Sequence, residues 1–144
     1  MSADVIVTRL RSFLLMLASA LCAGIIIELG LTGHFKELVQ FVPFTLCGLG
    51  LIALLAVLFR PNRTTLWALR IIMLIAALGG LLGVYEHLSG NLEFAQEVKA
   101  AQAANAPLKM ALTGANPPLA PGALVVTAMI AGAATYFHPA LKEA

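Results

Sequence analysis

Residues 38–59 read LVQFVPFTLCGLGLIALLAVLF, and no charged residue interrupts this run. A helix that crosses a bilayer needs ~20 mostly apolar residues, so the run has the length of one membrane span. Further apolar runs lie at about 10–31, 66–88 and 119–137. Hydrophobic residues make up 60% of the chain and charged residues 11%, which is more apolar surface than a soluble domain can bury. We therefore predict an all-α integral membrane protein, an antiparallel bundle of four transmembrane helices in one domain covering residues 1–144.

The first run has one alternative interpretation, a cleaved signal peptide. Arg9 and Arg11 supply a basic start, and residues 18–20 (ASA) resemble a peptidase site. The apolar run nevertheless continues through residues 21–27, which is typical of a retained anchor. We therefore interpret residues 10–31 as the first span.

The basic residues predict the orientation of the chain, because cytoplasmic loops carry an excess of lysine and arginine. With the N-terminus inside, the inner side holds Arg9, Arg11, Arg60, Arg63, Arg70 and Lys142, and the outer side holds Lys36, Lys99 and Lys109. This distribution favours a multi-pass protein of the plasma (inner) membrane whose two termini are both cytoplasmic. Two termini on one side require an even number of spans, which agrees with four.

The connection between the third and fourth runs, residues 89–118, is predicted to be the one long outer loop. Asn91 is suited to cap a short extramembrane helix there, because its side chain can accept a hydrogen bond from a first-turn N–H. We expect that helix to end near residues 105–107. A second short turn at 108–113 and a stiff, extended lead at 116–122 would then follow.

Small residues at four-residue spacing predict where helices touch, because association in lipid depends on close packing. Such pairs are Ala20 with Gly24, Ala76 with Gly80, Gly79 with Gly83, and Ala128 with Gly132. We expect these positions to lie at helix–helix contacts of a tight bundle.

The two cysteines, Cys22 and Cys47, fall near the middle of neighbouring antiparallel runs and have no CxxC spacing. A thiol needs thiolate character and access for redox chemistry, and an apolar bilayer centre provides neither. We therefore expect both to pack in the core as small apolar residues.

Four ionisable residues, Glu28, His34, Glu86 and His87, gather near the predicted outer ends of the first and third spans. A carboxylate inside a span costs free energy unless it is protonated, paired or facing water, so Glu28 is the first functional candidate. If the two spans touch, these carboxylate and imidazole groups could bind a divalent metal or relay protons. The alternative is that they are solvated at the headgroup level and only mark the span ends. No fixed-spacing signature such as HExxH is present, so we assign no metal site, catalytic residue or cofactor.

Arg70 lies about one turn inside the third span, next to Trp67. We expect its guanidinium to reach the headgroups along its aliphatic stem. Pairing with Glu143 or with the C-terminal carboxylate is an open alternative.

Four spans in a short chain, with a glutamate in the first, resemble the small multidrug-resistance exporters in topology. The resemblance implies proton-coupled exchange driven by the first-span acid. In that family the acid lies deep in the first helix and the third loop is short, whereas Glu28 lies near an outer end and residues 89–118 form a long loop.

For function, the sequence favours a non-enzymatic accessory or interaction subunit of a membrane complex, or a self-associating bundle. Packing residues are plentiful, and few ionisable groups lie inside the spans. One alternative is a small transporter or ion-binding protein that uses the outer Glu/His residues, and a second is a membrane enzyme acting on a lipid-soluble substrate. The expected partners are the bilayer, other membrane-protein subunits or further copies of the chain. A net charge of +2 without a basic stripe argues against nucleic acid.

Overall fold

The computed structural model describes residues 2–97 and 106–141, and the described chain is almost entirely helical. The elements are α1 (Ala3–Leu31), η1 (Leu38–Gln40), α2 (Phe41–Phe59), α3 (Arg63–Glu97), α4 (Ala106–Thr113), α5 (Leu119–Ala134) and η2 (Pro139–Leu141), where η marks a short 3₁₀ turn. No strand occurs among these described elements, so the all-α prediction is confirmed.

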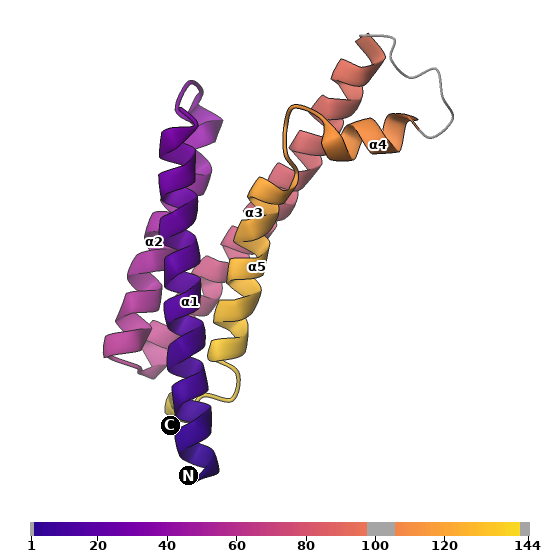
Figure 1. Cartoon of the computed structure of the whole chain (residues 1–144). Helices are drawn as coiled ribbons and strands as arrows, with labels where there is room; N and C mark the ends of the chain where they lie inside the picture. The colour runs from indigo at the N-terminus through magenta and orange to yellow at the C-terminus, as the bar shows by residue number, and fades with distance from the viewer. Residues whose placement is uncertain (1, 98–105, 142–144) are drawn as a thin grey trace.

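Four of the helices form a ring in which each helix packs on two others. The contacts join α1 to α2, α2 to α3, α3 to α5, and α5 to α1, so α1 and α3 lie on opposite sides of the ring. Successive helices of the ring run antiparallel, and the two chain ends lie at the same end of the molecule (Figure 1). At the other end, the α1–α2 pair and the upper part of α3 diverge (Figure 1).

Three helices are long and apolar enough to cross a membrane: Ala3–Leu31, Leu38–Phe59 and Arg63–Ala95. Only 17%, 28% and 22% of their most apolar windows are buried inside the molecule, so most of these side chains face outward and suit a hydrocarbon solvent. The remaining apolar helix, α5, has 16 residues. At a rise of 1.5 Å per residue it covers about 24 Å, less than the ~30 Å hydrocarbon core. The fourth span therefore stays a prediction.

The apolar core lies in the part of the ring nearest the chain ends. Its most buried members are Leu15, Ala18 and Cys22 of α1, Cys47, Leu54 and Val57 of α2, Leu66, Leu69, Met73 and Ala76 of α3, and Leu124, Ala131 and Ala134 of α5. The two cysteines are fully buried and free. The expectation that Cys22 and Cys47 pack in the core is therefore confirmed.

The glycines of α3 allow its neighbours to approach closely. A Cβ added at Gly79 would lie 2.9 Å from a side-chain carbon of Leu46, and one added at Gly80 would lie 2.9 Å from the Pro121 carbonyl oxygen. The predicted contact role is therefore confirmed for these glycines. It is wrong for Gly24 and Gly132, where an added Cβ would meet no atom within 4 Å.

The third helix was predicted to end at Leu88, but α3 continues to Glu97. No proline lies between Arg63 and Glu97, so nothing forces the backbone out of its helical hydrogen bonding. The prediction that Asn91 caps a new helix is wrong, since Asn91 lies inside α3. The predicted end of that helix, at residues 105–107, falls partly outside the described residues.

The return from α3 to the ring passes through α4, which covers the short turn predicted at 108–113. The lead into α5 is shorter than the predicted 116–122, because α5 already begins at Leu119. Pro121 is the third residue of α5, where a missing N–H costs no intrahelical hydrogen bond.

Candidate functional site

The residues predicted to gather on the outer side lie on two separate parts of the molecule. Glu28 is exposed near the end of α1, and half-buried His34 follows that helix. Glu86 is exposed and His87 half-buried on α3, which leads away from α1 at this level (Figure 1). Within residues 2–97 and 106–141, no group of three or more His, Cys, Asp or Glu is arranged to hold a metal ion.

His87 contacts the backbone that leads into α5. Its Nδ1 lies 3.0 Å from the carbonyl oxygen of Pro117. A carbonyl oxygen can only accept, so Nδ1 carries the proton in this hydrogen bond. This bond ties the C-terminal third of α3 to the segment between α4 and α5.

Asn91 forms a buried polar junction between α3 and the segment that returns from α4. Its Nδ2 donates to the carbonyl oxygens of Ala111 at 2.9 Å and Asn116 at 2.8 Å. Its Oδ1 accepts from the Asn116 N–H at 3.0 Å. The residue is only 3% exposed, and both amide hydrogens and the carbonyl are used, so its burial leaves no polar atom unpaired.

These contacts order a projecting unit that we call the arm, defined as residues 86–97 and 106–118. With 35 residues, α3 is about 52 Å long, which exceeds the ~30 Å hydrocarbon core. The arm projects away from α1 and α2 (Figure 1). Phe94 is 59% exposed on it and Leu112 54% exposed.

At the opposite end of the molecule, two arginines bind the C-terminal end of α5. Arg70 of α3 donates from Nη2 to the Thr135 carbonyl oxygen at 2.7 Å and from Nε to the Thr135 Oγ1 at 3.3 Å. Arg11 of α1 donates from Nη2 to the carbonyl oxygens of Tyr136 at 3.2 Å and Phe137 at 3.0 Å. Cations are favourable there because the last helical carbonyls lack intrahelical partners and carry the negative end of the helix dipole. We call these five residues the arginine clamp.

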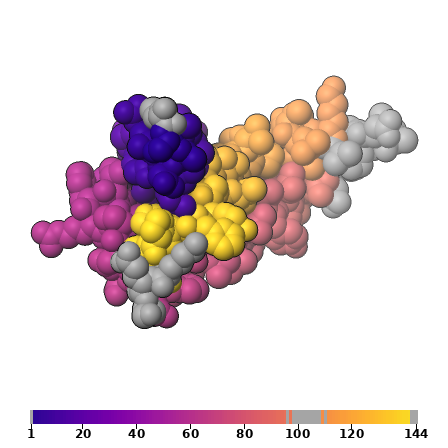
Figure 2. All heavy atoms as spheres, turned by 90° about the horizontal axis from the view of Figure 1, so that it is seen from below, coloured from indigo at the N-terminus to yellow at the C-terminus, as the bar shows by residue number. Residues whose placement is uncertain are grey.

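The clamp joins three elements at the end where the chain begins and ends. Seen from that end, the yellow C-terminal residues lie against the indigo residues of α1 and the magenta residues beside them (Figure 2). The sequence alone places Arg70 at the headgroups, but the structure gives its guanidinium a protein partner, Thr135. It also lies 5.4 Å from the centroid of the Trp67 ring. Glu143, the alternative partner, lies outside the described residues.

His138 lies immediately beyond the clamp and just past the predicted fourth span. Burial lowers the pKa of its imidazole, and the positive charges of Arg11 and Arg70 lower it further. Its Nδ1 accepts a hydrogen bond from the Ala140 N–H at 3.2 Å, which requires that nitrogen to be unprotonated. The surroundings therefore favour a neutral histidine.

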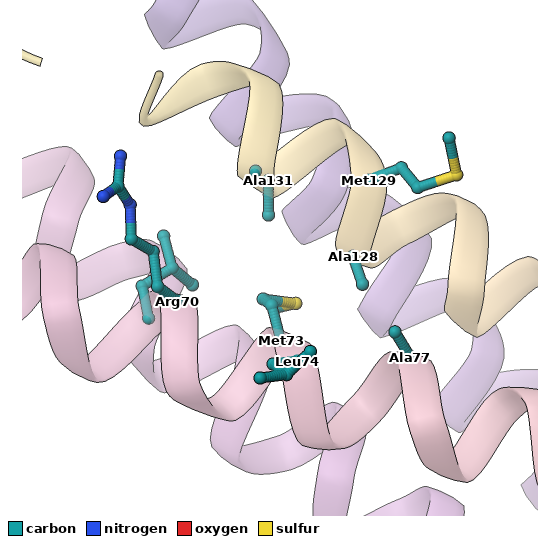
Figure 3. A pocket seen from close by; sticks show the side chains of 9 residues that line it. Arg70, Met73, Leu74, Ala77, Ala128, Met129 and Ala131 are labelled. Carbon is teal, nitrogen blue, oxygen red and sulfur yellow. The ribbon is translucent and has the colours of Figure 1, made fainter. Parts of the chain in front are cut away.

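Beside Arg70, a hollow of about 240 Å³ opens between α3 and α5 (Figure 3). We call it the α3–α5 groove. Apart from Arg70, its lining is apolar and includes Met73, Leu74, Ala77, Ala128, Met129 and Gly132. Arg70 extends at one end of the groove, away from Ala77 and Ala128 (Figure 3).

The fold and these features define an all-helical chain with three helices of membrane-spanning length. No protein-family model, curated protein or solved structure matches the chain.

Proposed function

We propose that the chain is a non-enzymatic interaction subunit of a membrane complex, anchored by four spans, and that the arm docks its partner. The observation that carries this proposal is the combination of an arm ordered by a fully bonded Asn91 with large apolar side chains exposed on that arm.

The ordering of the arm is the first support. Fixing the backbone of one residue costs ~1–2 kcal/mol in conformational entropy, so an ordered extension needs compensating contacts. The Asn91 junction and the His87–Pro117 hydrogen bond supply such contacts. A segment that is already ordered loses less entropy when it binds, which favours a preorganised docking surface.

The exposed side chains of the arm are the second support. Phe94 and Leu112 lie beyond the apolar core of the ring, in the part of the chain proposed to face water. Contiguous exposed apolar patches mark sites of protein interaction, and we propose that Phe94 and Leu112 belong to such a patch. The partner is another membrane-protein subunit or a second copy of the chain.

We propose that the protein lies in the plasma (inner) membrane with both termini cytoplasmic. Arg11, Arg63 and Arg70 belong to the end of the molecule where the termini lie, as an excess of inner positive charge requires. With α5 as the fourth span, its 16 residues need local thinning of the bilayer, which costs only a fraction of a kcal/mol per Å of mismatch.

Labelling of intact cells with a membrane-impermeant maleimide tests this topology. Single cysteines are introduced as Ser2→Cys, Lys109→Cys and Leu141→Cys in a chain whose own cysteines are replaced by alanine. We expect labelling at position 109 alone before the cells are opened, and at all three afterwards. Labelling at position 141 but not at position 2 in intact cells would show that α5 does not return the chain to the inner side.

Native mass spectrometry of protein extracted from its own membrane in mild detergent tests the docking function. We expect the wild type to have a mass above the 15.1 kDa of one chain, and Phe94→Ala with Leu112→Ala to leave a lone chain. The matched control is Leu78→Ala with Leu81→Ala, a pair that is also exposed on α3 but within its spanning part. A wild type that is monomeric in every mild detergent, or an arm variant with an unchanged mass, would contradict the proposal.

A further inference from the structure

The α3–α5 groove exists because the two helices touch tightly at one place and separate at another. Near the start of α5, an added Cβ at Gly83 would lie 2.8 Å from Cβ of Pro121. Beside Arg70, an added Cβ at Gly132 would meet no atom within 4 Å. The methyl group of Ala128 and the lack of a side chain at Gly132 leave the space between the separated parts of the helices unfilled.

The size and lining of the groove suit one alkyl chain. Its volume of about 240 Å³ is below the ~300–1,000 Å³ of pockets for drug-sized ligands. Leu74 and Met129 on its edge are exposed at the outer surface of the ring, so the groove is open to whatever surrounds the helices. Methionine side chains such as Met73 and Met129 adapt their shape to a flexible apolar ligand.

The end of the groove at Arg70 carries positive charge that the described part of the chain leaves uncompensated. The four hydrogen bonds that Arg11 and Arg70 make within residues 2–97 and 106–141 all go to neutral acceptors of Thr135–Phe137. A guanidinium has five N–H donors. Arg70 binds Thr135 through Nε and Nη2. Among residues 2–97 and 106–141, its Nη1 amino group has no hydrogen-bond partner, so it can bind a ligand.

We propose that this groove is a binding site for an anionic phospholipid, with one acyl chain along the apolar lining and the phosphate at Arg70. A guanidinium matches the geometry of phosphate oxygens and binds them through short, charge-assisted hydrogen bonds. Basic pockets between helices at the cytoplasmic face of a membrane bind anionic headgroups in this way. The site lies at the basic end of the molecule, opposite the arm, so it is independent of the docking function proposed above.

Native mass spectrometry with added lipid tests the site on the full chain. The purified protein is stripped of lipid and titrated with phosphatidylglycerol or phosphatidylcholine carrying identical acyl chains. We expect the dissociation constant for the first lipid molecule to be about fivefold lower for phosphatidylglycerol than for phosphatidylcholine. One basic residue near a membrane surface contributes roughly that factor.

Two variants separate the acyl site from the charge. Gly132→Leu adds a side chain whose Cβ meets no atom within 4 Å, and we expect it to fill the groove and abolish the preference. Its matched control is Gly24→Leu, because Gly24 is also exposed, helical and open on its side-chain face, and we expect it to keep the preference. Arg70→Gln keeps hydrogen-bond donors but removes the charge, so it should bind the two lipids equally. Excess inorganic phosphate should not displace the bound phosphatidylglycerol, because the acyl chain contributes to binding.

Equal binding of the two lipids by the wild type overturns the proposal, whatever the variants do. So does a full preference in Gly132→Leu. Displacement by inorganic phosphate alone would show an anion site without an acyl subsite, and this also overturns it. Helix content measured by circular dichroism identifies a variant that fails to fold. In that case the proposal is tested by the affinities of the wild type for phosphatidylglycerol and phosphatidylcholine.

Discussion

Gly114 lies so close to Asn91 that a Cβ at position 114 would overlap the Asn91 carboxamide. The same carboxamide is bonded to backbone groups of Ala111 and Asn116, on either side of Gly114 along the chain. The end of α4 and the segment that follows it therefore wrap around one buried side chain of α3, and only glycine fits at the point of closest approach.

Gly114→Ala should destabilise the arm by about 1–3 kcal/mol, because the added methyl group must displace a fully bonded side chain. Hydrogen exchange in detergent micelles, read at residues 106–118, measures the effect. Gly24→Ala is the control, since its added Cβ meets open space and alanine favours a helix by ~1 kcal/mol over glycine. Unchanged exchange in Gly114→Ala would contradict the close contact.

Asn91→Ala should release α4 while leaving the ring folded. The substitution leaves the Asn116 N–H and two carbonyl oxygens without their partner, at a cost of ~1–3 kcal/mol for each group that stays buried. Faster exchange confined to residues 106–118, with α1 and α2 unaffected, is the expected outcome. Asn116→Ala is a matched control, because Asn116 joins this network only through its backbone. If both variants behave alike, the Asn91 side chain is not what orders the arm.

Arg70→Met should lower the free energy of unfolding by about 1.5–3 kcal/mol, the usual range for hydrogen bonds to a charged group. Methionine retains much of the length of the side chain but cannot donate to Thr135. Thermal unfolding in one detergent compares it with Arg63→Met, which removes an exposed arginine from the start of the same helix and should change stability by less than ~0.5 kcal/mol. Equal effects of the two substitutions would mean that the clamp contributes nothing specific.

The protein should lose stability as the pH falls below ~6.5, the ordinary pKa of histidine. Burial, then Arg11 and Arg70, lower the pKa of His138 in the folded state. The unfolded chain therefore binds the proton first, and the contribution of His138 is complete above its unfolded pKa and lost as the pH falls through its folded pKa. Melting temperatures at pH 7.5 and pH 5 measure this loss. His138→Gln should reduce the difference between the two temperatures, and an undiminished difference would assign the pH dependence to other groups.

The sequence predicts α1, α2 and α3 because each is an apolar run of membrane-crossing length, and that feature is local. It does not predict their order around the ring. In lipid every face of such a helix is apolar, so the pattern does not show which face meets another helix. The pairing of α5 with α3 depends instead on where Gly80 and Gly83 admit Pro121.

The polar features were predicted less well, for two physical reasons. The preference of asparagine for helix caps suggested a helix start at Asn91, whereas the absence of proline between Arg63 and Glu97 was the signal for a continuous helix. The partners of Arg70 and Arg11 are mainly backbone carbonyls at residues 135–137. Any residue type presents a carbonyl, so no sequence pattern marks these acceptors.

Since α3 is unbroken from Arg63 to Glu97, Asn91 and Arg70 belong to one stiff rod and lie about 32 Å apart along its axis. The contact of Gly80 with Pro121 lies between them. A tilt of the rod about that contact would displace its two ends in opposite directions. A force applied to the arm would thus change the spacing of α3 and α5 at Arg70.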